Sequence, residues 1–437
     1  MLVIKNYLWW SFWLGLILAC SIPTTHAAAL DSIEFLSGAK LEGKVLSIDK
    51  QQRKVQFESM IAGNTRAGSY PYETIHRVLW KGKEYIVTPK PTQPTSTPKP
   101  GTSTVVNRSP SEIRNLIDTE GRSTPDWLAS TPLNHPKTLD LNWPHPAPKP
   151  WNSGKNIGQY IWDRINPNAR QWRSGLRLMY HLSSMHQTKG ELRTRIQRSI
   201  GSMYFRFFQD YSRAAWWWEQ AGPGAGNHDV IGLAECYFRL GSRDMAQQIL
   251  GKSGNSVGKI KLLGAMGETK KALQLANSFT RYANQPHEAL LVAGDICRAT
   301  DQFEMAIEFY KKVLSAKPAR NEQYSKRYRG RATDSIESIK LFELLDITQL
   351  ANGTYTGSSL GYEAPLHVAA TVQSGRIVKL EITQHREKQY YSALRDVPEQ
   401  IIRKQDLKQV DATSRATITA IAIINATAKA LTSDQQP

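Results

Sequence analysis

A hydroxyl-rich stretch near the carboxyl end, Asp411-Ala412-Thr413-Ser414-Arg415-Ala416-Thr417-Ile418-Thr419, holds the residues best suited to chemistry. Apolar residues recur at three- and four-residue steps over residues 418–431, which predicts a buried helix face. Ser414 and Thr413 are candidate N-cap residues, because their hydroxyls accept hydrogen bonds from the first helical turn. The same free N–H groups and the helix dipole also favour a phosphate. The residue types therefore leave two interpretations open: helix capping alone, or an anion site centred on Thr417.

An ordered series of motifs precedes this stretch. It comprises Asn352-Gly353-Thr354-Tyr355-Thr356-Gly357, then Gly361-Tyr362, a hairpin from Pro365 to Thr383 around Gln373-Ser374-Gly375, then His385-Arg386-Glu387-Lys388-Gln389-Tyr390-Tyr391, and a helix that ends at Gln405. In this order, the motifs resemble the FMN-binding domain of the C subunit of sodium-pumping NADH:quinone reductase and of the G subunit of the Rnf complex. The resemblance implies an α+β fold.

The resemblance also implies a cofactor and its attachment. In the family, a hydroxyl in the last motif carries FMN through a phosphoester, and the matching position is Thr417. The candidate cofactor-binding residues are Thr417, Ser414, Ala416, Asp411 and Arg415. A FAD:protein FMN transferase, with FAD as donor and magnesium, is the implied maturation partner.

Two positions depart from the family pattern: Asn352 replaces an aspartate, and Arg415 replaces a glycine. A glycine often marks positive φ or a close backbone approach, and arginine provides neither. An arginine beside a phosphoester can instead form a charge-assisted hydrogen bond to it. Two outcomes follow: a covalently flavinylated domain, or a degenerate domain that has lost attachment.

The chain is strongly basic. Its 437 residues include 56 Lys and Arg against 38 Asp and Glu, a formal net charge of +18. This balance favours acidic partners, anionic membrane surfaces or nucleic acid. The only dense cluster is Lys326-Arg327-Tyr328-Arg329-Gly330-Arg331, and we interpret the charge as solvated helix faces. Since no nucleic-acid-binding motif accompanies it, no nucleic-acid partner is expected.

Three cysteines occur, without haem or paired zinc-ligand spacing, and no metal site is expected. Cys236 and Cys297 lie in apolar helix patterns, where a small buried hydrophobe is the expected role. A disulfide between these two residues is an alternative that their spacing does not support.

The amino-terminal residues predict export. Residues 1–29 show Lys5, an apolar run from Leu8 to Ala19 and the small-residue zone Thr25-His26-Ala27-Ala28-Ala29, the order of a signal peptide. The mature protein is expected in the periplasm or elsewhere outside the cytoplasm. Ile17-Leu18-Ala19-Cys20 resembles a lipobox, so lipid anchoring at the membrane is the alternative to a free form.

Two regions separate the signal peptide from the helical part. Over residues 30–88, about five short β-rich runs alternate with turn signals, among them Gly63 and Gly68, and predict a small β-barrel-like module. Residues 89–150 form a Pro/Thr/Ser-rich linker. Its second part contains Trp127 and Trp143, which suggest that it lies against the next domain.

Residues 151–345 predict tetratricopeptide-like helical repeats. The clearest unit has Gly294 twelve residues before Ala306 and Pro318 twelve after it, with Tyr310 filling the groove. Weaker copies centre on alanines 214, 246 and 272. The block Trp216-Trp217-Trp218 has at least one core residue and is also a candidate aromatic ligand site.

The predicted fold class is multidomain: a small N-terminal all-β module, a central all-α tetratricopeptide-like solenoid, and a C-terminal α+β FMN-binding domain over residues 346–437. The sequence leaves two hypotheses for the function. The first is an extracytoplasmic electron-transfer flavoprotein that docks to unidentified redox partner proteins through its repeats. The second is a non-redox scaffold with an unflavinylated domain. No signature of an enzyme with its own small-molecule substrate is present, and His385 either hydrogen-bonds the flavin or is solvated.

Overall fold

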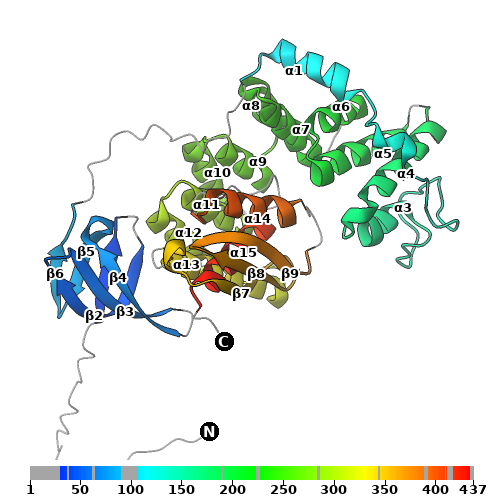
Figure 1. The fold of residues 1–437 in the computed structure, drawn as a ribbon. Coiled ribbons are helices and arrows are strands. Elements are labelled where there is room, and N and C mark those ends of the chain that lie inside the picture. Colours follow the sequence, from blue (N-terminus) through cyan, green and yellow to red (C-terminus); the bar gives the residue numbers. More distant parts are fainter. Residues whose placement is uncertain are drawn as a thin grey trace, which may run out of the picture.

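The structure, a computed structural model, describes residues 30–36, 39–61, 64–89, 107–188, 190–222, 227–282, 286–342, 345–387, 392–408, 410 and 417–433. Figure 1 shows a blue β module, a green helical array, and a yellow-to-red part that combines a sheet with helices. This order of all-β, all-α and α+β parts confirms the predicted fold class. The predicted signal peptide lies outside the described residues. None of the described helices is long and apolar enough to cross a membrane.

The N-terminal module is an antiparallel sheet in the order β4-β3-β2-β1-β5-β6. Its strands are β1 (Asp31–Phe35), β2 (Lys40–Asp49), β3 (Lys54–Ile61), β4 (Asn64–Pro71), β5 (Ile75–Trp80) and β6 (Lys83–Ile86), with the short helix η1 (Tyr72–Thr74) before β5. The sequence predicts about five strands and misses β4, because Gly63 and Gly68 are residues typical of turns. Gly68 instead lies within β4 and pairs with Phe57 of β3.

Part of the segment predicted as linker is folded onto the array. It contains α1 (Pro110–Leu116), the π-helical segment η2 (Ile117–Gly121) and α2 (Trp127–Ser130). A capping box starts α1: Ser109 Oγ accepts from the Glu112 amide at 3.3 Å, and the Glu112 carboxylate accepts from the Ser109 amide at 2.7 Å. Ile113 and Ile117 are buried, and η2 packs against α6 (Tyr211–Ala221).

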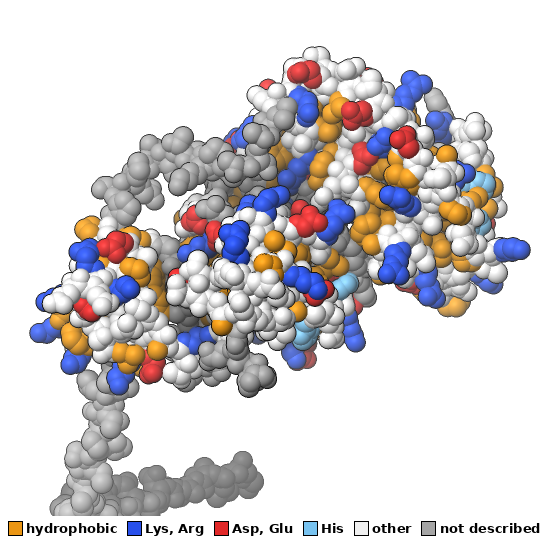
Figure 2. Space-filling model, viewed as in Figure 1, with side chains coloured by type: hydrophobic (Ala, Val, Ile, Leu, Met, Phe, Trp, Pro, Cys, Tyr) orange, Lys and Arg blue, Asp and Glu red, His pale blue; other side chains and the backbone are white. Residues whose placement is uncertain are grey.

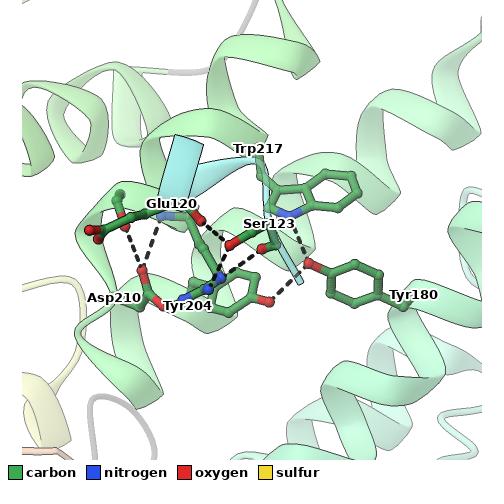
Figure 3. A network of polar contacts seen from close by, with 8 residues as sticks. Glu120, Ser123, Tyr180, Tyr204, Asp210 and Trp217 are labelled. Carbon is green, nitrogen blue, oxygen red and sulfur yellow. Dashed lines mark hydrogen bonds and ion pairs between the residues drawn. The ribbon is translucent and has the colours of Figure 1, made fainter. Parts of the chain in front are cut away.

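A polar network fixes this segment to the array (Figure 3). The Arg213 guanidinium donates to the Ser123 carbonyl at 2.8 Å and to the Asp210 carboxylate at 2.5 Å. Beside it, the hydroxyls of Tyr180 and Tyr204 lie 2.9 Å apart. From about residue 107 onward, the chain therefore belongs structurally to the array rather than to a free linker.

The array itself is built from helices that pack in pairs: α5 with α6, α7 with α8, α9 with α10, and α11 with α12. Its elements are α3 (Ile157–Tyr160), η3 (Ile161–Ile165), η4 (Ala169–Gln171), α4 (Trp172–Met185), α5 (Glu191–Met203), η5 (Tyr204–Phe208), α6, α7 (Asn227–Leu240), α8 (Arg243–Lys252), α9 (Val257–Ala265), α10 (Thr269–Tyr282), α11 (His287–Ala299), α12 (Phe303–Ser315) and α13 (Glu322–Phe342). The second helix of each pair holds one fully buried repeat alanine: Ala214, Ala246, Ala272 or Ala306.

The α11–α12 pair shows why the repeat anchors are what they are. Tyr310 is fully buried, and its hydroxyl donates to Asp295 Oδ1 at 2.8 Å. Its ring lies over Gly294, where an added Cβ would be 2.4 Å from Tyr310 Cε1. Only glycine permits this approach. In the tryptophan block, Trp217 and Trp218 are buried and belong to the core.

The C-terminal part has the antiparallel sheet β7-β8-β9 and two helices. Its elements are η6 (Ile347–Gln349), β7 (Gly353–Leu360), β8 (Pro365–Gln373), β9 (Arg376–Gln384), α14 (Ala393–Lys404) and α15 (Thr417–Leu431). The predicted hairpin is confirmed, with φ of 50° at Ser374 and 68° at Gly375 between β8 and β9. The helix predicted to end at Gln405 is also confirmed.

Helix α15 is buried on nearly all sides. It packs against the strands β7 and β8 and against the helices α13 and α14. The last helix of the array is therefore in direct contact with the C-terminal domain. On the face seen in Figure 2, Lys and Arg side chains are scattered among other residues and form no single continuous field.

Candidate functional site

The predicted site residue Thr417 is the first described residue of α15 and is half-buried. It lines a cavity bounded by α9, α11 and α13 of the array and by β7 and α15 of the C-terminal domain. The other predicted site residues, Asp411, Ser414, Arg415 and Ala416, lie outside the described residues, so their roles stay predictions.

Asp334 of α13 holds the C-terminal domain against the array. Its Oδ2 accepts from Ser359 Oγ at 2.6 Å and from the Leu360 amide at 2.7 Å. Its Oδ1 receives Lys429 Nζ of α15 at 2.7 Å. One carboxylate thus joins a strand end and the flanking helix to α13.

Arg331, one turn earlier on α13, makes a second connection. Its guanidinium donates to the Gly361 carbonyl at 3.0 Å and to the Tyr362 carbonyl at 2.8 Å. Burial lowers the pKa of Arg331, while Tyr328 and Glu387 act in the opposite direction. The charge cluster of residues 326–331 is therefore not only a solvated face, because Arg331 lies in the interface between the two domains.

Glu387 brings together three motifs that are far apart in the sequence. Its carboxylate accepts from the Tyr362 amide at 2.8 Å and from the Thr419 hydroxyl. A Cβ at Gly361 would lie 2.1 Å from Glu387 Oε1, so a larger residue there would displace the Glu387 carboxylate. Nearby, the Glu387 amide donates to His385 Nδ1 at 3.3 Å, and burial lowers the pKa of His385. His385 is thus half-buried rather than fully solvated.

A cluster of polar residues forms part of the cavity wall. Burial raises the pKa of Asp295 to about 6, although the charge of Arg298 and the hydroxyl of Tyr310 favour its ionised form. Asn425, which is 2 % exposed, donates to Ser335 Oγ at 3.3 Å. Its Oδ1 has no hydrogen-bond partner among the described residues. Asp295, Ser335 and Asn425 all line the cavity. The wall therefore contains a carboxyl that can exchange a proton near neutral pH and an unsatisfied acceptor.

These residues suit the phosphate end of a flavin nucleotide. Lys261 and Arg331 line the same cavity as Thr417, and their positive charges favour a phosphate bonded to its hydroxyl. Glu288 and Asp295 also line the cavity and partly offset this charge, and the Glu288 carboxylate lies 3.2 Å from Lys261 Nζ. The cavity volume is about 30 Å³, enough for about one water, so both a phosphate group and an isoalloxazine ring on Thr417 would have to lie largely outside it.

Sequence analysis did not identify Asp295, Arg331 or Asn425 as part of this site. Asn425 had a usable signal, because a polar residue interrupts the apolar pattern of residues 418–431. Asp295 and Arg331 had no such signal. Each lies on a helix of the array, and the residues that face it across the cavity are far away in the sequence. Cys236 and Cys297 are both buried and free, which rules out the alternative disulfide between them. In the part of the chain that the structure describes, no three His, Cys, Asp or Glu residues are placed to hold a metal ion.

Two known protein families match parts of this chain. The FMN-binding domain family matches residues 361–432, a range that includes Glu387 and Thr417. A tetratricopeptide repeat matches residues 287–320, which span α11 and α12 with the anchors Gly294 and Ala306. Neither curated proteins nor solved structures yield a match to the chain. The chain therefore carries an FMN-binding domain at its carboxyl end, preceded by a tetratricopeptide repeat.

Proposed function

We propose that this chain is an exported electron-transfer flavoprotein whose FMN is joined to Thr417 through a phosphoester. The observation that carries the proposal is the position of Thr417. It lies within the FMN-binding domain, at the start of α15, in a cavity that Lys261 and Arg331 also line. A hydroxyl that shares a cavity with two cationic side chains is a suitable acceptor for a phosphate group.

Attachment from FAD is a phosphoryl-group transfer without oxidation or reduction. The Thr417 oxygen bonds to the phosphorus of the FMN half, and the bond from that phosphorus to the bridging oxygen breaks. AMP leaves with the bridging oxygen, and the hydroxyl proton is released. The transferase supplies the catalytic groups and magnesium, so this chain contributes only the acceptor and its surroundings.

Bound FMN supplies one- or two-electron transfer, and the protein positions it. Here Asp334 and Arg331 hold the FMN-binding domain against α13, so the attachment residue has a fixed place relative to the array. Asp295 can take up or release a proton at the cavity wall, because its pKa is raised to about 6. The helical array then serves as the docking surface for redox partner proteins.

The proposed location follows from residues 1–29, which have the order of a signal peptide. A covalent bond retains a cofactor where it cannot be recaptured from the cytoplasmic pool. Lipid attachment at Cys20, or the net charge of +18, would add association with an anionic membrane surface.

The test is intact-mass spectrometry of the protein coexpressed with a FAD:protein FMN transferase. The parent should gain the mass of one FMN less one water, Thr417→Ser should retain part of it, and Thr417→Val should lose it. Thr354→Val is the matched control, because Thr354 is an exposed threonine of β7 whose hydroxyl lies 3.2 Å from that of Thr371 and which does not line this cavity. This control should keep full occupancy.

Two outcomes would overturn the proposal. If Thr417→Val still carries the adduct, Thr417 is not the attachment residue. If the parent carries none, the chain is the non-redox scaffold. Arg415→Gly separates the two roles of Arg415, since occupancy rises if the arginine hinders attachment and falls if it pairs with the phosphate.

A further inference from the structure

A second, larger cavity lies at the opposite end of the array from Thr417. It has a volume of about 250 Å³ and is lined by η3, α5, η5 and Trp143 of the segment that precedes the array. Figure 1 shows α3 to α5 well separated from α15. This cavity is therefore independent of the FMN-binding domain.

The lining is strongly cationic. Arg195, Arg198 and Arg206 all contribute to it, and no described residue of the lining carries a carboxylate. Outside the lining, Asp229 Oδ2 lies 3.7 Å from Arg198 Nε, which makes an ion pair without a direct hydrogen bond. Burial lowers the pKa of Arg195, and the charge of Glu191 only partly opposes this. Asp229 thus balances part of the charge of Arg198, and Glu191 part of that of Arg195, while both of these carboxylates lie outside the cavity lining.

Several polar atoms of this wall lack a partner. Arg195 Nε, Arg198 Nε and Asn166 Oδ1 are buried without a hydrogen bond among the described residues. Asn166 lines the cavity and is only 5 % exposed. Buried polar atoms without partners are few in folded proteins and are costly. Arg198 Nε still faces the Asp229 carboxylate, so Arg195 Nε and Asn166 Oδ1 are the two atoms of this wall that a bound polar group would satisfy.

The rest of the wall is aromatic and held in place. Trp143, Trp162 and Phe207 line the cavity. The Arg195 guanidinium lies 4.5 Å from the Trp143 ring centre, and Phe207 stacks on Trp172 at 4.9 Å. Two lining elements, η3 and η5, are π-helical segments, which occur frequently at functional sites.

We infer that this cavity binds a small-molecule oxyanion, either a carboxylate or a phosphate monoester, with an apolar part that packs against the aromatic wall. Guanidinium groups bind both kinds of anion through paired hydrogen bonds. The volume suits a ligand about the size of one substituted ring, smaller than the usual drug-sized pocket of about 300–1,000 Å³.

The test is calorimetric titration of the full chain with benzoate, phenyl phosphate, inorganic phosphate and benzyl alcohol. Benzoate or phenyl phosphate should bind at least about tenfold more tightly than benzyl alcohol, which has the ring without the charge. The tighter of the two identifies the carboxylate or the phosphate as the preferred group. Inorganic phosphate should bind more weakly than phenyl phosphate, because it lacks the apolar part.

Two variants locate the binding. Arg198→Gln removes a cation, and Ser202→Asp places a carboxylate in the cavity while every arginine remains; each should weaken anion binding about tenfold or more. Arg173→Gln is the matched control, since Arg173 stacks on Trp127 at 5.1 Å and does not line the cavity. Its affinity should equal that of the parent. The inference is overturned if neither anion binds, if benzyl alcohol binds equally well, or if correctly folded Ser202→Asp binds as the parent does.

Discussion

Replacement of Asp334 by alanine should loosen the FMN-binding domain from the array. Its carboxylate, on a side chain 18 % exposed, accepts from Ser359, the Leu360 amide and Lys429 at 2.6–2.7 Å. Hydrogen bonds to charged groups contribute about 1.5–3 kcal/mol each, but Lys429 retains Glu337 at 3.4 Å, and the contributions are not additive. We therefore expect a loss of about 2–4 kcal/mol in the free energy of unfolding of the C-terminal domain.

Hydrogen–deuterium exchange with mass spectrometry measures this loss locally. In Asp334→Ala, β7 and α15 should exchange faster, because opening of the domain becomes less costly. Helices α4 to α6, at the other end of the array, should exchange as in the parent. Urea unfolding of the same variant, followed by circular dichroism, gives the free energy itself.

Glu337→Ala is the control for this experiment. Glu337 lies on the same helix and contacts the same Lys429, but at 3.4 Å and with a side chain 29 % exposed. An ion pair of this kind contributes at most about 1 kcal/mol. Equal stability of Asp334→Ala and Glu337→Ala would refute the assignment of Asp334 as the residue that joins the two domains.

Two further predictions concern α11. Gly294→Ala should lower the free energy of unfolding of the array by about 1–3 kcal/mol in urea, since its Cβ would lie 2.4 Å from the Tyr310 ring. Gly251→Ala on α8 is the control and should be neutral or stabilising, because the space around Gly251 is open. Equal effects of the two substitutions would contradict the packing argument. Asp295 has a raised pKa of about 6, so its contribution to stability is full below about pH 4 and is lost as the pH rises through about 6. The parent should therefore lose stability over this interval relative to Asp295→Asn, and a difference independent of pH would contradict the burial of this carboxyl.

Local spacing was enough to predict the repeat and the hairpin. The distances from Gly294 to Ala306 and from Ala306 to Tyr310 place these residues on facing helices, and the structure packs them together. Gly375 follows a turn signal in the same direct way, because positive φ favours glycine. Such features depend on neighbours in the chain, which a sequence shows.

The remaining features depend on contacts between distant residues. Strand β4 is not predicted, because glycines such as Gly68 are typical of turns. Gly68 is in a strand because β4 pairs with β3, where Gly68 lies opposite Phe57. Arg331 belongs to a charged run that is typical of a solvated face, and only the approach of Gly361 gives it an interface role. The site around Thr417 likewise required the packing of α13 against α15, which no periodicity indicates.

The position of α13 bears on how such a chain can be divided and recombined. This helix closes the array against α11 and α12 and also forms one wall of the C-terminal domain against β7 and α15. A cut near residue 346 would strip an apolar covering from both pieces and leave Lys429 without the Asp334 carboxylate. A C-terminal domain exchanged between proteins would therefore fold correctly only when α13 is transferred with it. Helix α13 and the C-terminal domain thus form one structural unit.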